Sequence, residues 1–336
     1  MPPMKAIAID RYGDNSQVKL RELPDPVPGA GDLLVEVHAA SINPVDFKIR
    51  DGKLKAIVPL KFPLVLGSDL SGVVRAVGAQ VTGFKPGDEV FARVEKDRLG
   101  TYAELAALSA STAALKPKNL THVEAASLPL VGLTAWQALV ELIHLQAGQK
   151  VLIHAGAGGV GSFAIQLAKH LGATVATTAS ARNQVLCSQL GADVVIDYNK
   201  QRFEDAVHDC DAVLDTLGGD TLLRSFGVVK PGGTVVSIAA LPDAATAEKW
   251  GMNPAIRLAL RFLTRKITAA ARARGVTYRY LFMDPSGEQL AQIAALVEQG
   301  AIKPQVEKTF PLAETAAALA AVETGRTRGK VVVQIR

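Results

Sequence analysis

The sequence predicts an α/β protein with two domains, a compact β barrel or roll and a doubly wound parallel sheet. Turn-forming glycines and prolines are dense in the first third of the chain, where they separate short strand-like segments. From residue 150 the pattern changes to short apolar strands that alternate with helices ending in glycine, which is typical of a parallel sheet. A length of 336 residues suits two domains of ordinary size.

Composition and charge exclude several classes of protein. Hydrophobic residues make up 49% of the chain and charged residues 21%, so we expect complete folding around a sizeable core. The net charge of +5 is too small to indicate nucleic-acid binding but suits an anionic ligand. Two cysteines, Cys187 and Cys210, supply neither a disulfide framework nor a four-cysteine zinc lobe, which favours a reducing, cytoplasmic compartment. No apolar run in the sequence matches a signal peptide or a membrane helix, so we expect neither secretion nor a membrane partner.

Strand and turn patterns account for the chain up to residue 120. Apolar and polar residues alternate most clearly at 33–39, directly after a proline-rich turn at 24–32. We predict strands at 4–10, 17–23, 33–41, 62–78 and 90–94. The pattern becomes helical at Thr121, which forms a capping-box pattern with Glu124, and apolar residues continue at helical spacing to residue 145. We therefore place a domain boundary between residues 125 and 126.

Strands and helices alternate over the rest of the chain. We predict strands within 150–156, 173–180, 193–198, 211–219, 234–240 and 275–283, joined by right-handed crossovers. The helices expected between the first three of these strands lie at 162–172 and 182–191. A long helical stretch rich in alanine and arginine covers 243–274. Helices at 288–300 and 314–325 and a strand at 330–336 complete the chain.

A glycine motif follows the first strand of the parallel sheet. Gly156, Gly158 and Gly161 form a GxGxxG pattern between a buried strand and an amphipathic helix. These glycines permit a tight turn, close approach to a pyrophosphate and close packing of helix on strand, while the helix N-terminus presents N–H groups to the anion. The alternative is a simple strand-to-helix turn. The regular strands that follow favour a dinucleotide site.

The end of the second strand indicates which dinucleotide is bound. A site for NAD usually carries a carboxylate there, which would repel the 2′-phosphate of NADPH. In this chain the strand ends in Ser180 and Arg182, whose hydroxyl and guanidinium can bind a phosphate. We therefore predict NADPH as the cofactor. The alternative is that Ser180 caps the next helix and Arg182 is solvated.

Nearly all of the chain resembles the medium-chain dehydrogenase/reductase superfamily, specifically its zinc-independent quinone oxidoreductase and enone (alkenal/one) reductase branch. The matching segments are SINPVDFKIRDG, VLGSDLSGVVRAVG, FKPGDEV, GTYAEL, AASLPLVGLTAWQAL, HAGAGGVGSFAIQLAK, LGADVVIDY and GRTRGKVVVQIR. The resemblance implies a chaperonin-10-like β-barrel catalytic domain, formed by residues 1–125 and 285–336, and a Rossmann domain at 126–284 that binds NADPH. It also implies a substrate cleft between the two domains.

A zinc site is not expected. The alcohol dehydrogenases of this superfamily hold zinc with a cysteine in the segment that corresponds to SINPVD and a histidine in a GHE motif. This chain has Asn43 at the first place and Gly67, Ser68 and Asp69 at the second, so it offers neither a thiolate nor an imidazole. The six histidines contain no pair at a metal-ligand spacing. We predict that the protein binds no metal.

Further cofactor contacts follow from the resemblance, taken residue by residue. Three of these residues have an alternative role without cofactor contact: Tyr198 only covers the sheet, Phe282 belongs to the core, and Lys330 is a solvated surface lysine. Together, the glycine motif and the resemblance indicate contacts at Lys48, Gly156, Gly158, Gly159, Val160, Gly161, Ser180, Arg182, Tyr198, Thr216, Ile238, Ala239, Ala240, Phe282, Met283, Gly329 and Lys330.

The expected reaction is hydride transfer from NADPH to a quinone or to the C=C bond of an α,β-unsaturated carbonyl compound. Asn43, Lys48 and Tyr102 are the candidates for stabilising the developing oxyanion, and Asp46 would fix their loop. An Asx turn around Pro44 is the alternative for Asn43 and Asp46. The alternative function is that of an NADPH-binding redox sensor or structural protein without significant turnover.

The partners expected are a small-molecule substrate and a second copy of the chain, with no nucleic acid. The segment YRYLFM is a possible edge strand for a homodimer. The arginine-rich stretch at 257–274 is expected to be a solvated helix that covers the cleft or a subunit edge. Attachment to a membrane surface or to RNA is the lesser alternative for this stretch.

Overall fold

The computed structural model describes residues 3–55, 60–249 and 251–336. The chain divides into two compact units, which we describe separately. Unit 1 comprises Met1–Leu133 and Asp284–Arg336, and unit 2 comprises Thr134–Met283. The predicted boundaries lie between residues 125 and 126 and between residues 284 and 285. In the structure the first boundary lies later, between residues 133 and 134, and the second boundary lies earlier by a single residue, between residues 283 and 284.

Unit 1 is built mainly from antiparallel strands. Its larger sheet has seven strands in the order β15-β16-β3-β5-β6-β8, with β7 also paired to β3, and its smaller sheet has the order β2-β1-β4. The strands are β1 (Met4–Ile9), β2 (Lys19–Leu23), β3 (Asp32–Ser41), β4 (Leu64–Val65), β5 (Asp69–Val77), β6 (Glu89–Arg93), β7 (Leu105–Ser109), β8 (Ala113–Leu115), β15 (Val306–Pro311) and β16 (Lys330–Gln334). The predicted barrel-like domain is therefore confirmed.

Apolar side chains at alternate positions of β3 form a core of this unit. Leu33, Val35 and Val37 are buried against Leu70 of β5 and Leu108 of β7. Strand β15 was missed by the sequence analysis because its side chains are mostly exposed, so apolar and polar residues do not alternate in it. Unit 1 also contains α1 (Pro44–Arg50), α2 (His122–Ala126), α10 (Gly287–Glu298) and α11 (Thr315–Glu323).

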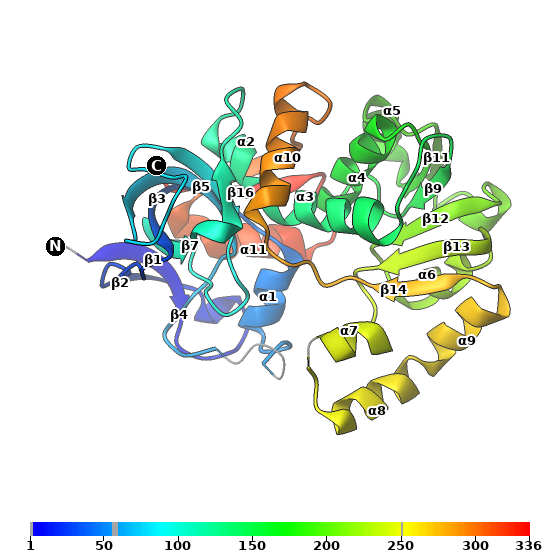
Figure 1. Ribbon diagram of the computed structural model, residues 1–336, viewed down its shortest axis with the longest axis horizontal. Coiled ribbons are helices and arrows are strands. Elements are labelled where there is room, and N and C mark those ends of the chain that lie inside the picture. The colour runs from blue at the N-terminus through cyan, green and yellow to red at the C-terminus, as the bar shows by residue number, and fades with distance from the viewer. Residues whose placement is uncertain (1–2, 56–59, 250) are drawn as a thin grey trace. The chain divides into compact units, whose positions relative to one another are not determined.

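Unit 2 contains a six-stranded parallel sheet in the order β11-β10-β9-β12-β13-β14. The strands are β9 (Lys150–Ile153), β10 (Thr174–Ala179), β11 (Val194–Asp197), β12 (Cys210–Asp215), β13 (Val229–Ser237) and β14 (Thr277–Tyr280). Helices α4 (Gly159–His170) and α5 (Gln184–Gln189) pack on β9, β10 and β11, while α6 (Gly219–Ser225) and α9 (Arg265–Ala273) pack on β12 and β14 (Figure 1). Every predicted strand of this sheet is present, which confirms the doubly wound fold.

Two predicted long helices are broken in the structure. The capping box is confirmed, since the Glu124 N–H donates to Thr121 Oγ1 at 3.3 Å and the Thr121 N–H donates to the Glu124 carboxylate at 2.9 Å. The helix it begins ends at Ala126, and α3 (Pro129–Trp136) starts afresh at a proline, which lacks the N–H needed to continue a helix. A π-helical turn, Gln137–Leu142, follows. The stretch 243–274 likewise forms α7 (Ala244–Lys249), α8 (Pro254–Leu263) and α9, with a new start at Pro254.

Short 3₁₀ turns complete both units at Asn15–Gln17, Ala110–Thr112, Ala181–Asn183, Phe203–Asp205 and Leu312–Glu314. Within the described part of the chain, none of the helices has both the length and the apolar character that crossing a membrane requires.

Candidate active site

The predicted glycine motif forms the turn between β9 and α4. A Cβ atom at Gly156 would overlap Thr177 Oγ1, and one at Gly161 would overlap the backbone oxygen of Ala155. These two glycines are therefore required by the packing of helix on strand, as the motif predicts. A Cβ at Gly158 would meet only the Ala155 oxygen, at 3.3 Å, so the need for glycine there is weaker within the protein itself.

The N-terminus of α4 is suited to bind an anion. Gly158 is its N-cap residue and offers no side chain, so the first N–H groups of the helix are not capped from there. Gly159, Val160 and Gly161 form the first turn of this twelve-residue helix, where the helix dipole is positive. Ala155 precedes the motif with φ of 52°, a left-handed conformation that the sequence analysis did not foresee. The loop can thus cradle a pyrophosphate.

Three predicted phosphate or adenine contacts lie at the carboxyl ends of β10 and β11. Ser180 directly follows β10 and its side chain makes no capping hydrogen bond, so its alternative role as a helix cap is not fulfilled. Arg182 is exposed in the 3₁₀ turn that follows. Tyr198 directly follows β11, is 61% exposed, and donates its N–H to the Ala179 oxygen at 3.4 Å. Because β10 and β11 are parallel neighbours, these side chains lie at one edge of the sheet.

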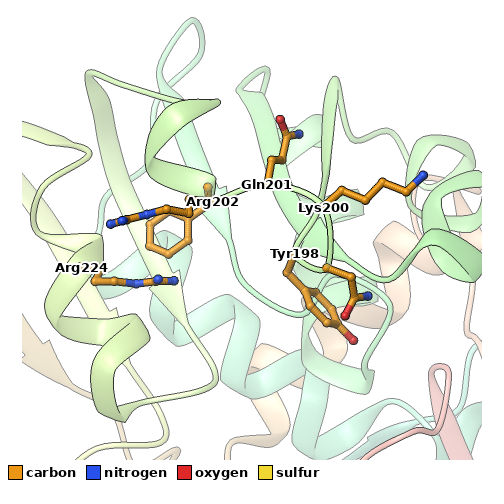
Figure 2. A pocket seen from close by; sticks show the side chains of 7 residues that line it. Tyr198, Lys200, Gln201, Arg202 and Arg224 are labelled. Atoms are coloured by element: carbon orange, nitrogen blue, oxygen red, sulfur yellow. The ribbon is translucent and has the colours of Figure 1, made fainter.

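A cavity of about 280 Å³ opens beside Tyr198. Figure 2 shows Tyr198 and Lys200 on one side of it and Arg202 and Arg224 together on the other. Both arginines pair with Glu204 Oε1, at 2.9 Å from Arg202 Nη2 and 3.3 Å from Arg224 Nε. Tyr198 is the one predicted cofactor residue among those that line the cavity, which are Tyr198, Asn199, Lys200, Gln201, Arg202, Phe203 and Arg224. The sequence analysis missed this cavity because Arg224 comes from a different element, α6.

The residues predicted for the nicotinamide half also follow strands. Thr216 follows β12 and donates its hydroxyl to the His154 oxygen at 3.0 Å. Ile238, Ala239 and Ala240 follow β13, and the Ile238 N–H donates to the Asp215 oxygen at 3.0 Å. Phe282 and Met283 come shortly after β14, at the boundary of unit 2. In unit 2 the predicted contacts therefore follow the carboxyl ends of the sheet strands, where open α/β sheets bind ligands.

His154, which directly follows β9, is a buried, neutral group at the carboxyl ends of the sheet strands. Its Nε2 is 2.9 Å from Ser225 Oγ and its Nδ1 is 3.2 Å from Thr178 Oγ1. Burial lowers the pKa of His154 to about 4. The imidazole is therefore uncharged at neutral pH and joins α6 to the end of β10.

In unit 1 the predicted site residues Asn43, Tyr102 and Lys330 belong to a buried polar network. Asp46, in the first turn of α1, accepts three hydrogen bonds: from the Asn43 N–H at 2.7 Å, from Tyr102 Oη at 2.6 Å and from Ser68 Oγ at 3.1 Å. Burial raises the pKa of Asp46, and the hydrogen bonds from Tyr102 and Asn43 oppose that shift. The network therefore ties α1 to two loops of the barrel.

The same network extends to Lys330 at the start of β16. Its Nζ donates to the Ile42 oxygen at 2.7 Å and to Asn43 Oδ1, and lies 4.0 Å from Asp69 Oδ2. Asn43 in turn donates its Nδ2 to Asp69 Oδ2 at 2.9 Å, and Arg93 Nε lies 3.9 Å from Asp69 Oδ1. Burial lowers the pKa of Lys330 to about 8.

These contacts differ from the roles predicted for three residues. The sequence predicted that Asn43 and Tyr102 face a substrate, but both are fully buried, and the Tyr102 hydroxyl donates to Asp46. Lys330 is neither solvated nor exposed to a ligand, because its ammonium is enclosed by backbone and carboxylate oxygens. Gly329 before it has φ of 65°, and a Cβ there would overlap the Gln305 oxygen. Lys48, on the exposed side of α1, is the remaining candidate with an accessible charge.

Ser68, Asp69 and Arg93 belong to this network and were not assigned a role from sequence. The available signal was the placement of charged residues inside predicted apolar strands, where a charge is buried only with partners. In the described ranges 3–55, 60–249 and 251–336, no three side chains of His, Cys, Asp or Glu are grouped to hold a metal ion.

Comparison with known proteins agrees with this architecture. Residues 29–118 match the family model described as the alcohol dehydrogenase GroES-like domain, and residues 190–333 match the model described as zinc-binding dehydrogenase. The chain is 37% identical to the mouse mitochondrial NAD(P)H oxidoreductase RTN4IP1, over 99% of this chain and 89% of that protein.

Two further relatives resemble the chain over most of its length. It is 37% identical to the chloroplastic NADPH-dependent alkenal/one oxidoreductase of Arabidopsis thaliana, over 98% of this chain and 79% of that protein. The solved quinone oxidoreductase of Coxiella burnetii has a TM-score of 0.85 and 35% identity, and the match covers 99% of each chain. The protein is therefore an oxidoreductase that uses a nicotinamide cofactor, and it belongs to the quinone oxidoreductase and enone reductase branch of the medium-chain dehydrogenase/reductase superfamily.

Proposed function

We propose that the protein is an NADPH-dependent reductase of quinones or of the C=C bond of α,β-unsaturated carbonyl compounds, and that it works without zinc. The observation that carries this proposal is the buried network around Asn43, Asp69 and Lys330, which takes the place of a Lewis acid site. Without a Lewis acid to stabilise an alkoxide, alcohol oxidation is disfavoured, whereas reduction of an electron-poor acceptor needs less assistance. Relatives named for alkenal/one and quinone reduction support the same reaction class.

The residues present do not fit a zinc ion. Cysteine thiolate and histidine nitrogen are the usual zinc ligands in this superfamily, and Asn43 and Ser68 stand in their places. Asn43 Oδ1 already accepts from the Lys330 ammonium, and Ser68 Oγ donates to Asp46. A further positive charge beside those of Lys330 and Arg93 would be repelled. The zinc named in the matching family model therefore plays no part in the proposed reaction.

The preference for NADPH rests on the carboxyl end of β10. Ser180 and the exposed Arg182 follow this strand, and no carboxylate comes directly after it to repel a 2′-phosphate. Tyr198 adds an exposed aromatic ring at the end of the neighbouring strand. We assign the 2′-phosphate to the phosphate corner formed by Ser180, Arg182 and Tyr198, and the pyrophosphate to the first turn of α4.

Bound NADPH supplies the hydride, and the chain binds and positions the reactants. The exposed ammonium of Lys48 is the group we assign to the cofactor or to the developing oxyanion. Asp46 lies two residues earlier on α1, and its hydrogen bonds to Tyr102 and Ser68 hold that helix in place. We therefore assign Asn43, Asp46 and Tyr102 as positioning residues rather than as groups that touch the substrate.

The test is NADPH oxidation with a panel of short-chain enones, alkenals, p-benzoquinone and phenanthrenequinone, in the presence of EDTA. Products are identified by mass spectrometry. Saturated carbonyl products would establish C=C reduction, and hydroquinone products alone would establish quinone reduction. Turnover abolished by EDTA and restored by zinc would contradict the metal-free mechanism. Tight NADPH binding without turnover of any acceptor would refute the reductase proposal and favour a redox sensor.

A further inference from the structure

Helix α8 turns its apolar side chains toward solvent. None of its ten residues is buried, and Leu258, Phe262 and Leu263 are 68%, 62% and 59% exposed. Figure 1 shows α8 in yellow beyond the strands of its own unit, and the elements it packs on are α7 and α9. A surface helix of a water-soluble protein normally directs its apolar stripe at the core. This orientation needs a physical explanation.

The neighbouring helix has the ordinary orientation. In α9, Ala271 is buried and Ile267 packs against the core of unit 2, while Arg265, Lys266 and Arg272 are exposed. The inverted orientation is thus a property of α8 and not of the whole segment. Leaving four large apolar side chains exposed on one helix, those of Ile256, Leu258, Phe262 and Leu263, is costly in water, so the exposed face is suited to a non-aqueous contact.

The apolar face of α8 is bordered by positive charge. At 100° per residue, Leu258, Phe262 and Leu263 fall on one broad arc, and Arg257 and Arg261 fall together beside it. The Arg265 guanidinium carbon lies 4.1 Å from the centroid of the Phe262 ring, so a third cation borders the same face.

Acidic residues are scarce beside these charges in the sequence. Residues 254–274 contain six arginines and lysines, and the sequence from 249 to 283 contains no aspartate or glutamate. Arg257 pairs with Glu248 of α7, at 3.4 Å. A surface that is both apolar and cationic is complementary to an apolar and anionic one.

We propose that α8 and the start of α9 bind the surface of an anionic phospholipid bilayer. A ten-residue helix is about 15 Å long, half of a bilayer's hydrocarbon thickness, so it cannot span and would lie in the headgroup region. Leu258, Phe262 and Leu263 would enter the boundary of the acyl chains, and the arginines would contact lipid phosphates. From the sequence, membrane attachment of this stretch was only the lesser alternative, because periodicity does not show which way a helix faces.

A second copy of the chain fits the same face less well. An isologous contact places each patch against its own symmetry mate, so the arginines of α8 would face one another without intervening carboxylates of this segment. An anionic lipid surface avoids that repulsion. The proposal does not depend on the reductase activity, because it concerns a surface of unit 2 and is tested without cofactor or substrate.

The test is co-sedimentation of the full chain with vesicles of equimolar phosphatidylcholine and phosphatidylglycerol, compared with pure phosphatidylcholine, at low and high salt. We expect binding to the anionic vesicles that weakens as salt is raised. The double variant Leu258→Gln/Phe262→Gln should lower the partition coefficient at least about tenfold. Arg261→Gln should lower it about fivefold. The matched control is Val27→Gln/Val185→Gln, which replaces two other exposed apolar side chains and should leave binding unchanged.

Circular dichroism and urea unfolding check that each variant is folded. Absence of wild-type binding to the anionic vesicles at low salt would overturn the proposal. Equal loss of binding in the valine control would overturn the assignment to α8. Sedimentation velocity gives the oligomeric state of the same samples. Dissociation of a wild-type dimer by Leu258→Gln/Phe262→Gln, without any vesicle binding, would identify the face as an interface between copies instead.

Discussion

Replacing Lys330 by methionine tests whether this lysine holds the barrel together or contacts the cofactor. The change removes a donor to the Ile42 oxygen and to Asn43 Oδ1, and it removes the cation that lies 4.0 Å from Asp69 Oδ2. A hydrogen bond from a charged group contributes about 1.5–3 kcal/mol, and breaking a buried ion pair costs about 3–5 kcal/mol. The methionine side chain carries no charge, so the variant no longer incurs the desolvation cost of burying an ammonium, and this offsets part of the loss. We expect the free energy of unfolding to fall by about 3 kcal/mol.

The assay is urea unfolding of Lys330→Met beside Lys48→Met, an exposed lysine on α1 that provides the matched control. The control should change stability by no more than about 0.5 kcal/mol. Adding Asp69→Asn to Lys330→Met removes the carboxylate that has lost one of its two neighbouring cations, Lys330 and Arg93, so the double variant should lose less than the sum of the two single variants. A loss below about 0.5 kcal/mol for Lys330→Met, with NADPH affinity reduced at least about tenfold, would refute the structural role and restore a cofactor contact.

Three other variants test the site in unit 2. Arg182→Ala should weaken NADPH at least about tenfold and leave NADH binding nearly unchanged, measured by fluorescence titration, and an equal loss for both would remove Arg182 from the phosphate corner. Gly161→Ala should cost about 1–3 kcal/mol in urea unfolding and weaken cofactor binding because its Cβ would overlap the Ala155 oxygen, whereas Gly31→Ala, with open space around it, should not. Burial lowers the pKa of His154 to about 4, so at a pH between 4 and 6.5 the unfolded chain takes up a proton at this residue that the native state excludes. The contribution of His154 to the free energy of unfolding is therefore fully present above the unfolded pKa near 6.5 and is lost as the pH falls toward 4. Its share of that loss is about 3 kcal/mol, and unfolding of His154→Gln should depend less steeply on pH over this range; equal slopes for variant and wild type would contradict the buried, neutral imidazole.

The parallel sheet was predictable because its signals are local. A buried strand needs only a few consecutive apolar residues, and the glycine motif follows one directly, so β9, Gly156 and α4 could be placed from the sequence. The long predicted helices were less accurate. Pro129 and Pro254 both start new helices, since proline fits the first turn of a helix but not its interior.

The sequence by itself determined the strands of the parallel sheet, the dinucleotide motif and the lack of cysteine or histidine at the zinc positions, because each depends on neighbouring residues or on residue type alone. Only the tertiary structure decided that Asn43, Tyr102 and Lys330 share one buried network, since they come from distant parts of the chain and meet through strand pairing. It also decided which way α8 faces. Periodicity shows that a helix has an apolar side, but packing determines whether that side meets the core or the solvent.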